Sequence, residues 1–505
     1  MLGAVLENLA TYWQVHLLLV LYTILLAWHA YEGKKGTKGI VDYYVGGRAM
    51  GGVVIGLSFF ATYSSTNSFV GFTGQAYGWG LPWFLLVPFV VGFSLFAWIW
   101  VAPRLRHFTE ALDSLTIPDF VGFRFGSTPA RVFAAVIVIF ASFFYMTAVF
   151  KGIGNLLEVF LEIPYRWAIA VVYVVTMLYT AVGGFISVIK TDAVQGVILF
   201  VAAILLFTGT VNAAGGLGAL AAVREAPETS HLFTWNGGVA FPLLLGVLFA
   251  GTIKFAVDPR QLSRFYALES RQAAKTGVWV STVVFGVVYL MLVPVGLYAH
   301  RVLGPGIGDT DLVVPELLTA AGVFSAGTGA FLLVAMVAAA MSSLDSVLLV
   351  MASTCERDIV GILKPSDSEQ KAVRDTRLYV ALFATITAII ALEPPGGIVT
   401  LTALSGAMYA ACFFPAVVLG LWWRKGNGAS VIASFAAGLG VLFFWRFVPG
   451  SEILHEVFPA VALSLLAYVG VGRATGANPD RRVEELFRPA SAPEPASREE
   501  EVPVS

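Results

Sequence analysis

Five residues in the middle of one apolar stretch have the chemistry and the spacing of a cation site. The stretch FLLVAMVAAAMSSLDSVLLVMASTCERD runs from residue 331 to residue 358. Four of the five follow the i, i+3, i+4 and i+7 spacing of a single helix face: Ala339, Ser342, Ser343 and Ser346. Asp345 borders the same face. Such oxygen ligands suit a hard cation such as Na⁺ better than a soft one.

The element that must position these groups is a membrane helix. The residues from Phe331 to Met351 are long enough to cross a bilayer, which takes about 20 apolar residues. A carboxylate at mid-membrane depth costs about 2.5–3.5 kcal/mol on insertion scales, so it normally faces protein or water and serves a function. The presence of Asp345 therefore favours the interpretation that this helix carries an ion or proton site. In the structural alternative, the serines bond to carbonyl groups four residues earlier or join two helices.

The composition is that of an integral membrane protein. Of the 505 residues, 58% are hydrophobic and only 12% are charged, which predicts one all-α membrane domain rather than several soluble domains. The two cysteines, Cys355 and Cys412, provide no disulfide framework and have no metal-ligating neighbours in sequence. The sequence lacks a Walker loop and a G-x-S-x-G motif, so it gives no support for ATP-driven pumping, for an enzyme or for a nucleic-acid partner.

Hydropathy predicts thirteen membrane-spanning helices in this chain. They lie near residues 10–30, 50–72, 80–102, 131–160, 166–183, 187–212, 239–257, 276–300, 328–352, 378–393, 396–423, 429–448 and 457–472. The first apolar run has no small-residue cleavage motif after it, so we expect it to be retained as the first helix.

Lysine and arginine residues concentrate in alternate loops, which predicts the orientation of the protein. One set of loops, in which we place Arg260 and Arg264, holds most of these residues together with the C-terminal tail. The opposite loops hold only four: Arg166, Arg224, Arg301 and Arg446. The N-terminus is therefore predicted outside and the C-terminus in the cytoplasm. The tail 473–505, rich in Pro, Ala, Ser and Glu, is predicted to be disordered.

Two of the predicted spans are interrupted by residues that break helices. The second contains a polar patch over residues 61–68, and the seventh contains Lys254 followed by Asp258 and Pro259. Interrupted spans in corresponding places of two halves point to the binding site of an inverted-repeat transporter. Here the second span begins spans two to six, and the seventh begins spans seven to eleven. The alternative is ordinary glycine flexibility at a helix contact.

Three further charged residues lie within predicted spans. Asp192, near the start of the sixth span, is either a helix-capping carboxylate or a second ion ligand. Lys254 either forms an ion pair with Asp345 or Asp192, or anchors a carboxylate of a substrate. Lys151 is expected to extend to the membrane interface.

These stretches together resemble the sodium:solute symporter family. The segments that carry the resemblance are DYYVGGRAMG (42–51), ATYSSTNSFVG (61–71), YTAVGGFISVIKTDAVQG (179–196), DPRQLSRF (258–265) and AAAMSSLDSVLLVMAS (338–353). The resemblance, over about residues 42–423, implies a leucine-transporter-like fold with a 5+5 inverted repeat. Within one transport domain 1–472, it places the first helix at 10–30, repeat one at 50–212, repeat two at 239–423 and two extra helices at 429–472.

The resemblance also implies positions for the bound ions and the solute. A Na⁺ site would take the carbonyl groups of Ala61, Ser64 and Ala339 and the hydroxyl groups of Ser342 and Ser343. A second cation site would join Asp192 to hydroxyls matching Ser342, position 345 and Ser346. Position 345 is Asp345 here instead of a small polar residue, so it strengthens a second Na⁺ site, carries a coupling proton or pairs with Lys254. The implied substrate-binding residues are Asn67, Ser68, Gln75, Tyr145, Lys254 and Phe255.

The expected function is uptake of a small organic solute by Na⁺-coupled symport through alternating access, with Na⁺ as the coupling ion. A positive charge at Lys254 favours a carboxylate such as a monocarboxylate, an amino acid or pantothenate. The protein would lie among the lipids of a bacterial or archaeal inner membrane as a multi-pass protein. The alternatives are proton coupling within the same fold, motivated by Asp345 and Asp192, and a channel or an ion-linked sensor.

Overall fold

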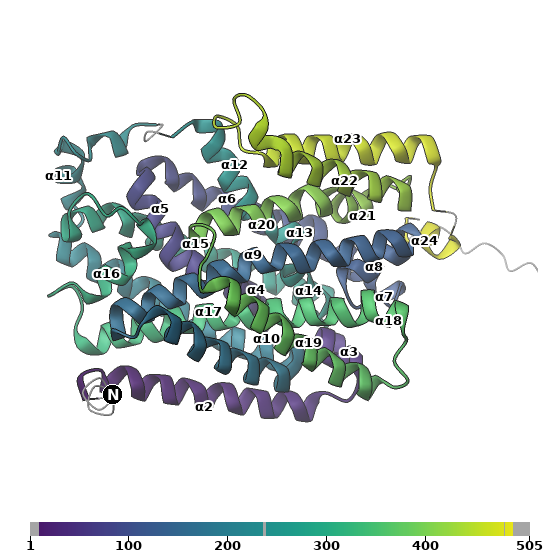
Figure 1. Cartoon of the computed structure of the whole chain (residues 1–505), viewed down its shortest axis with the longest axis horizontal. Coiled ribbons are helices and arrows are strands. Elements are labelled where there is room, and N and C mark those ends of the chain that lie inside the picture. The colour runs from purple at the N-terminus through teal and green to yellow at the C-terminus, as the bar shows by residue number, and fades with distance from the viewer. Residues whose placement is uncertain (1–9, 236–238, 479, 488–505) are drawn as a thin grey trace, which may run out of the picture.

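The structure is a computed structural model that describes residues 10–235, 239–478 and 480–487 (Figure 1). Within these ranges the regular elements are helices, and the β-structure is one isolated bridge between Met50 and Leu268. Most of the tail that the sequence predicts to be disordered, residues 488–505, lies outside the described residues.

Thirteen helical elements make up the first part of the chain. They are α2 (Trp13–Gly36), α3 (Ile40–Val45), η1 (Gly46–Arg48), α4 (Gly52–Tyr63), η2 (Asn67–Gly71), α5 (Phe72–Trp79), η3 (Leu81–Leu85), α6 (Leu86–Phe96), η4 (Ala97–Val101), α7 (Ala102–Ala111), α8 (Ile117–Phe125), α9 (Thr128–Leu161) and α10 (Tyr165–Ala214).

The second part of the chain begins with short helices on the loop after α10. Its elements are α11 (Ala219–Glu225), η5 (Ser230–Phe233), α12 (Phe241–Thr252), α13 (Lys254–Val257), α14 (Pro259–Tyr266), α15 (Arg271–Leu303), η6 (Thr310–Leu312), α16 (Val313–Thr319), α17 (Ala326–Cys355), η7 (Glu356–Val360), α18 (Gly361–Leu363), α19 (Glu369–Ala391), α20 (Ile398–Phe413), η8 (Phe414–Leu419), α21 (Gly420–Trp422), α22 (Gly428–Phe444), η9 (Trp445–Phe447), α23 (Val457–Thr475) and α24 (Arg481–Glu485).

Long apolar helices confirm the prediction of an all-helical, multi-pass membrane protein. In the described part of the chain, nine helical stretches are long and apolar enough to cross a bilayer. Two further apolar helices, α4 and α22, are shorter than these nine stretches. The stretches run side by side, with α2 along one edge of the bundle and α22 and α23 along the opposite edge (Figure 1).

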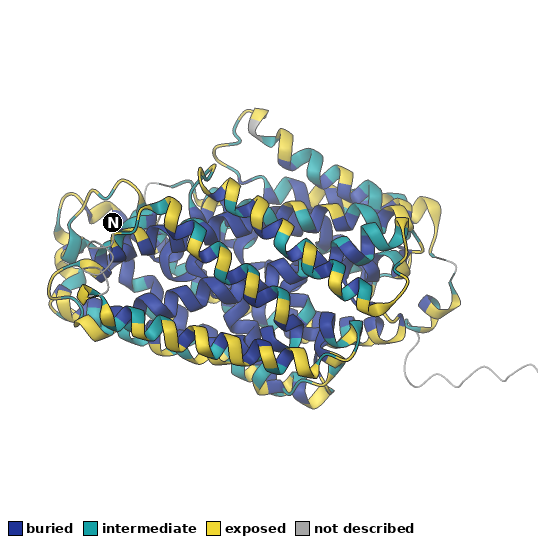
Figure 2. Cartoon of the chain, turned by 60° about the horizontal axis from the view of Figure 1, so that its bottom comes forward, coloured by how far each residue is buried: buried dark blue, intermediate teal, exposed yellow. Residues whose placement is uncertain are grey.

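The helix that carries the hydroxyl stripe lies in the centre of the bundle. Of the most apolar window within residues 326–363, which contains α17, 94% is buried, against 22% for α2. Buried residues fill the middle of the bundle and exposed residues follow its outer helices (Figure 2). Apolar side chains on the outer faces suit contact with lipid, whereas polar groups on α17 must find partners within the protein.

A single glycine separates the predicted fifth and sixth spans. Both lie within α10, which is helical from residue 165 to residue 214 except at Gly184, where φ is 62° and ψ is −171°. A side chain is strained at this backbone conformation, and a Cβ atom at Gly184 would lie 2.6 Å from the Tyr43 ring. Glycine therefore lets the chain change direction while Tyr43 packs against it.

Charged residues between the third and fourth predicted spans form a buried network instead of a solvated loop. Thr116 caps α8, and Asp119 in its first turn is fully buried. Asp119 forms ion pairs with Arg131 at 2.8 Å and with Arg357 at 2.7 Å. Arg131 also reaches Asp358 at 2.8 Å. Arg357 and Asp358 belong to η7, which directly follows α17. The network therefore joins α8 and α9 to the end of α17.

Candidate cation and solute site

The second predicted span is interrupted, as the sequence indicates. Helix α4 ends at Tyr63, Ser64 has an extended conformation (φ −79°, ψ 90°), and helical structure resumes at Asn67. The Ser65 side chain accepts a hydrogen bond from the Asn67 backbone N–H at 3.1 Å. Side chains of this kind compete with helical hydrogen bonds, which explains why a run of serine and threonine ends the helix. The last carbonyl groups of α4 therefore lack helical partners and are available to other groups.

The seventh predicted span is interrupted at the predicted Asp258–Pro259 step. Asp258 is extended (φ −77°, ψ 121°), as expected for a residue before proline, and its side chain caps α14. Its carboxylate accepts hydrogen bonds from the Arg260 backbone N–H at 2.9 Å and from the Arg260 guanidinium at 2.5 Å. Both interruptions that the sequence predicts are confirmed.

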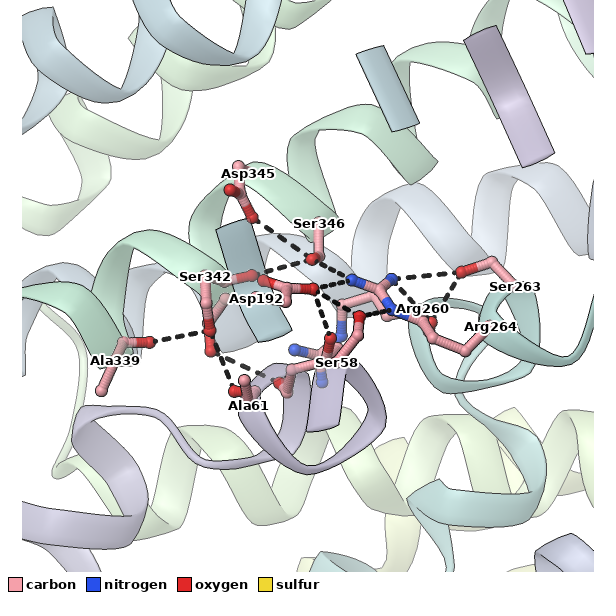
Figure 3. Close-up of polar contacts among 12 residues, drawn as sticks. Ser58, Ala61, Asp192, Arg260, Ser263, Arg264, Ala339, Ser342, Asp345 and Ser346 are labelled. Atoms are coloured by element: carbon pink, nitrogen blue, oxygen red, sulfur yellow. Dashed lines mark hydrogen bonds and ion pairs between the residues drawn. The ribbon is translucent and has the colours of Figure 1, made fainter. Parts of the chain in front are cut away.

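The hydroxyl stripe of α17 meets the broken end of α4 (Figure 3). Ser342 donates a hydrogen bond from Oγ to the Ala61 carbonyl at 2.9 Å and lies 3.4 Å from the Ala339 carbonyl. The Ser343 hydroxyl lies 3.4 Å from the carbonyl oxygen of Thr62, the residue after Ala61. The Ser64 hydroxyl, also buried, has no hydrogen-bond partner among the described residues. Carbonyl and hydroxyl oxygens from two separate helices thus gather at one place, and uncharged oxygen ligands of this kind fit a hard monovalent cation.

A buried carboxylate on α10 lies beside this cluster. One oxygen of Asp192 accepts hydrogen bonds from Ser58 at 2.8 Å and from Thr62 at 3.1 Å. The same oxygen accepts from the Arg264 guanidinium at 2.6 Å. Asp192 is therefore neither a free helix cap nor a partner of Lys254.

The second carboxylate, Asp345, has different neighbours. Its Oδ2 accepts a hydrogen bond from the Tyr179 hydroxyl at 2.7 Å, and its Oδ1 lies 3.2 Å from the Ser346 hydroxyl. The pairing of Asp345 with Lys254 that the sequence left open does not occur, because these contacts hold Asp345 against α10. Asp192 and Asp345 belong to one buried cluster, since Ser346 contacts both Asp345 and the Arg264 guanidinium.

Lys254 is buried and forms no ion pair among the described residues. Its side chain is 1% exposed, and its ammonium group has no hydrogen-bond partner among the described residues. The nitrogen lies 4.8 Å from the centre of the Tyr145 ring. Gly406 on α20 lets this helix approach, because a Cβ atom there would lie 2.7 Å from Lys254 Cε. A buried, unpaired ammonium group is costly, so the site favours a ligand with a negative charge.

The other predicted substrate residues differ in whether their side chains already have partners within the protein. The side-chain amide oxygen of Asn67, Oδ1, is buried and has no partner in the described structure, whereas Ser68 shares a 2.6 Å hydrogen bond with Tyr289. The Phe255 ring stacks on the Tyr63 ring with centres 4.2 Å apart. Gln75 is only half-buried, about two helical turns beyond Asn67. Asn67 and Lys254 thus have polar atoms without partners among the described residues, whereas the Tyr145 hydroxyl donates a hydrogen bond to Ser343 at 3.2 Å.

Sequence reasoning missed several buried polar residues. Arg264 is assigned from sequence to a loop but is completely buried, and only its i, i+4 spacing from Arg260 after the proline signalled that both share one helix face. Thr402 and Ser405 on α20 have buried hydroxyls without partners among the described residues, and Ser405 directly precedes Gly406. No local signal marks these two residues.

The interpretation of Lys151 is wrong. Its ammonium group forms an ion pair with Asp311 at 2.7 Å and lies 3.7 Å from Asp309, instead of extending to the membrane interface. The lysine is held inside the protein because Asp309 and Asp311, at the start of η6, lie against α9. Lys151 thus joins two elements that are distant in sequence.

A model of the family described as the Sodium:solute symporter family matches residues 43–438. The chain belongs to the sodium:solute symporter family. The chain is 30% identical over 480 residues to the high-affinity proline transporter PutP of Bacillus subtilis, covering 92% of this chain and 98% of that protein. It is 28% identical over 465 residues to the sodium/pantothenate symporter of Haemophilus influenzae, covering 89% and 93%. These relatives are transporters and not enzymes.

Solved structures show that the chain shares its fold with cation-coupled transporters. A substrate-bound, outward-open Na⁺-coupled sialic acid symporter aligns with a TM-score of 0.79 at 19% identity, covering 92% of this chain and 99% of that one. A nucleobase-cation-symport-1 family transporter in a closed conformation aligns with a TM-score of 0.52 at 13% identity, covering 88% and 98%. These neighbours have the leucine-transporter fold that the family resemblance implies.

Proposed function

We propose that this protein is a Na⁺-coupled symporter that takes up a small organic solute with a carboxylate group. The observation that carries the proposal is the meeting of the Ser342 hydroxyl with the Ala61 carbonyl at the break in α4. Family membership and the sodium-coupled relatives support it.

The Na⁺ site would use the oxygen atoms that the sequence indicates. These are the carbonyl oxygens of Ala61, Ser64 and Ala339 and the hydroxyl oxygens of Ser342 and Ser343. The Ser342 hydroxyl donates a hydrogen bond to the Ala61 carbonyl. With Na⁺, both oxygens would turn their lone pairs to the ion, which would hold α4 and α17 together more strongly than one hydrogen bond. Such a change in the contact between two helices is the kind that alternating access needs.

The solute would lie near Lys254, with its carboxylate on the ammonium group and its body against Tyr145. Asn67, and the hydroxyls of Thr402 and Ser405, would supply the uncharged contacts, since their polar atoms lack partners in the described structure. Proline and pantothenate, which the names of the relatives give, both carry a carboxylate. We infer this substrate class for the chain from the unpaired ammonium group. The roles that sequence resemblance assigns to Ser68, Gln75 and Phe255 stay proposals.

We further propose thirteen membrane crossings, with the N-terminus outside and the C-terminus in the cytoplasm of a prokaryotic inner membrane. The count follows if α10 crosses twice about Gly184, the broken pair α4 and α5 crosses once, and α19 and α22 each add one to the remaining apolar stretches. The inverted repeats would be residues 50–212 and 239–423, each beginning with an interrupted helix.

Uptake into proteoliposomes tests this function. Purified protein is reconstituted, and labelled proline, pantothenate, lactate and pyruvate are offered with an inward Na⁺ gradient, with equal Na⁺, and with an inward proton gradient alone. We expect accumulation of at least one of these acids above equilibrium only with the Na⁺ gradient. Accumulation driven by the proton gradient without Na⁺ would instead favour proton coupling, for which the buried Asp345 beside Asp192 is the specific observation. Uptake of the acids that never exceeds equilibrium would contradict symport.

A further inference from the structure

Arg264 lies at the position that the second predicted cation site would use (Figure 3). One nitrogen of its guanidinium, Nη2, donates to Asp192 Oδ2 at 2.6 Å and to the Ser346 hydroxyl at 2.6 Å. These are the carboxylate and one of the hydroxyls that sequence resemblance assigns to a second cation. Arg264 and Asp192 are both completely buried. A positive charge that belongs to the chain therefore already lies between two of the expected ligands.

The rest of the side chain is held as firmly as the nitrogen that faces Asp192. Nη1 donates to the Arg260 carbonyl at 3.0 Å and to the Ser263 hydroxyl at 3.2 Å. Nε donates to the Ser58 hydroxyl at 3.3 Å, and the guanidinium carbon lies 5.3 Å from the centre of the Phe185 ring. Since its donors have partners on α4, α10, α14 and α17, Arg264 is a built part of the site and not a surface cation that folds inward.

With both of its carboxylates ionised, the cluster needs one further cation for its charges to balance. Asp192 and Asp345 are carboxylates, Arg264 is a guanidinium, and all three are completely buried. With both carboxylates ionised, the three groups carry one net negative charge, which is costly inside a membrane protein. The first cation site contains only uncharged oxygens and adjoins this cluster, because Ser346 donates to the Ser342 carbonyl at 2.8 Å. One Na⁺ at that site brings the sum to zero.

We propose that Arg264 acts as a tethered cation that fills the second cation position, so that the protein binds a single exchangeable Na⁺. Asp345 then supplies the negative charge that compensates this Na⁺, which the uncharged ligands of the first site do not. The inference rests on the proposed function, because it takes Na⁺ as the coupling ion. It adds the number of ions bound and the residue that sets this number.

The test is equilibrium binding of ²²Na⁺ to purified protein, which requires no substrate and no transport. We expect one Na⁺ per chain for the wild type. Arg264→Gln removes the tethered charge and should bind two, because Asp192 then lacks its cation. The double variant Asp192→Asn with Arg264→Gln should return to one. Arg124→Gln is the matched control, since Arg124 is equally buried but bonds backbone carbonyl groups, and it should keep one.

The outcomes separate this inference from the proposed function. Two Na⁺ per wild-type chain would overturn the tethered-cation role while leaving Na⁺ symport intact. Absence of saturable ²²Na⁺ binding by folded wild-type protein would contradict the proposed function and the inference together. A folded Arg264→Gln variant that still binds one Na⁺ would also overturn the role of Arg264. If this variant does not fold, Arg264→Lys keeps a tethered charge and should bind one Na⁺, and the wild-type count alone still decides.

Discussion

The Ser342 hydroxyl lies 2.9 Å from the carbonyl oxygen of Ala61, although the two residues are 281 positions apart in the chain. Ala61 lies in the last turn of α4, three residues before its extended cap at Ser64. Ser342 lies in the most buried helix of the bundle. This contact joins the interrupted helix α4 to the helix α17, which carries the hydroxyl stripe. A cation bound between them would change how the two helices are held together.

Replacing Ser342 and Ser343 by alanine should weaken Na⁺ dependence. The double variant removes two oxygen ligands and keeps or improves helix propensity. We expect the Na⁺ concentration for half-maximal uptake to rise at least tenfold, which corresponds to about 1.4 kcal/mol of binding free energy. The measurement is initial uptake as a function of Na⁺ concentration in proteoliposomes. Ser353→Ala, on the same helix near its end, is the control, and unchanged Na⁺ dependence in the double variant would rule out this site.

Lys254→Gln should raise the KM for an acid substrate more than it alters Na⁺ dependence. A hydrogen bond to a charged group contributes about 1.5–3 kcal/mol, so the KM should rise by roughly tenfold or more. The wild type should prefer the acid to its neutral amide, and the variant should lose this preference. Lys371→Gln removes an exposed ammonium group that pairs with Asp367 and should change neither property. A variant that still discriminates acid from amide would show that Lys254 does not bind the carboxylate.

Asp345→Asn and Lys254→Gln should have independent effects. Asp345 contacts Tyr179 and Ser346, and Lys254 has no hydrogen-bond partner among the described residues, so neither compensates the other. In a double-mutant cycle of expression and Na⁺-coupled uptake, we expect additive losses. The charge of Asp345 should appear as a loss of Na⁺ affinity in the single variant. Recovery of folding and uptake in the double variant would instead mean that the two residues form a pair.

Cysteine labelling should place the loop after α10 outside and the loop before α19 in the cytoplasm. Cys355 and Cys412 are first replaced, and cysteine is then introduced at Glu228 or at Asp367, which are both exposed. An impermeant thiol reagent added to intact cells should modify position 228 only. After the cells are opened, both positions should react, which controls for accessibility. The reverse pattern in intact cells would invert the predicted orientation.

Asp119→Asn should destabilise the protein more than a change at an exposed ion pair. Asp119 is fully buried and pairs with Arg131 and Arg357, whose side chains are 15% and 24% exposed. Removing one partner of a buried ion pair lowers the free energy of unfolding by about 3 kcal/mol at the low end of the usual range. We expect the low end here because both arginine side chains are partly exposed to solvent. Asp367→Asn, at an exposed pair, should cost about 0.5 kcal/mol or less. Thermal melting of the purified variants in detergent compares them, and equal melting temperatures would contradict a stabilising role for the network.

The sequence by itself determined the features that depend on neighbouring residues. Apolar runs of membrane length predict helices, and the polar patch at 61–68 and the Asp258–Pro259 step predict the two interruptions, because helix propensity and backbone restriction act over a few residues. The spacing of Ser342, Ser343 and Ser346 likewise places their side chains together, since one helix fixes that geometry. For the same reason the fold class could be predicted well.

Only the tertiary structure decided which buried charges meet. Arg264 and Asp192 are 72 positions apart, and the sequence assigned one to a loop and the other to a helix start. The sequence left open whether Lys254 pairs with Asp345, pairs with Asp192 or binds a substrate, and in the structure it pairs with neither carboxylate. Lys151 instead pairs with Asp311. Such pairings depend on how whole helices pack and which rotamers remain open in a dense interior. No periodicity in the chain encodes those distances. The sequence therefore indicates that a buried charge needs a partner, but it does not identify the partner residue.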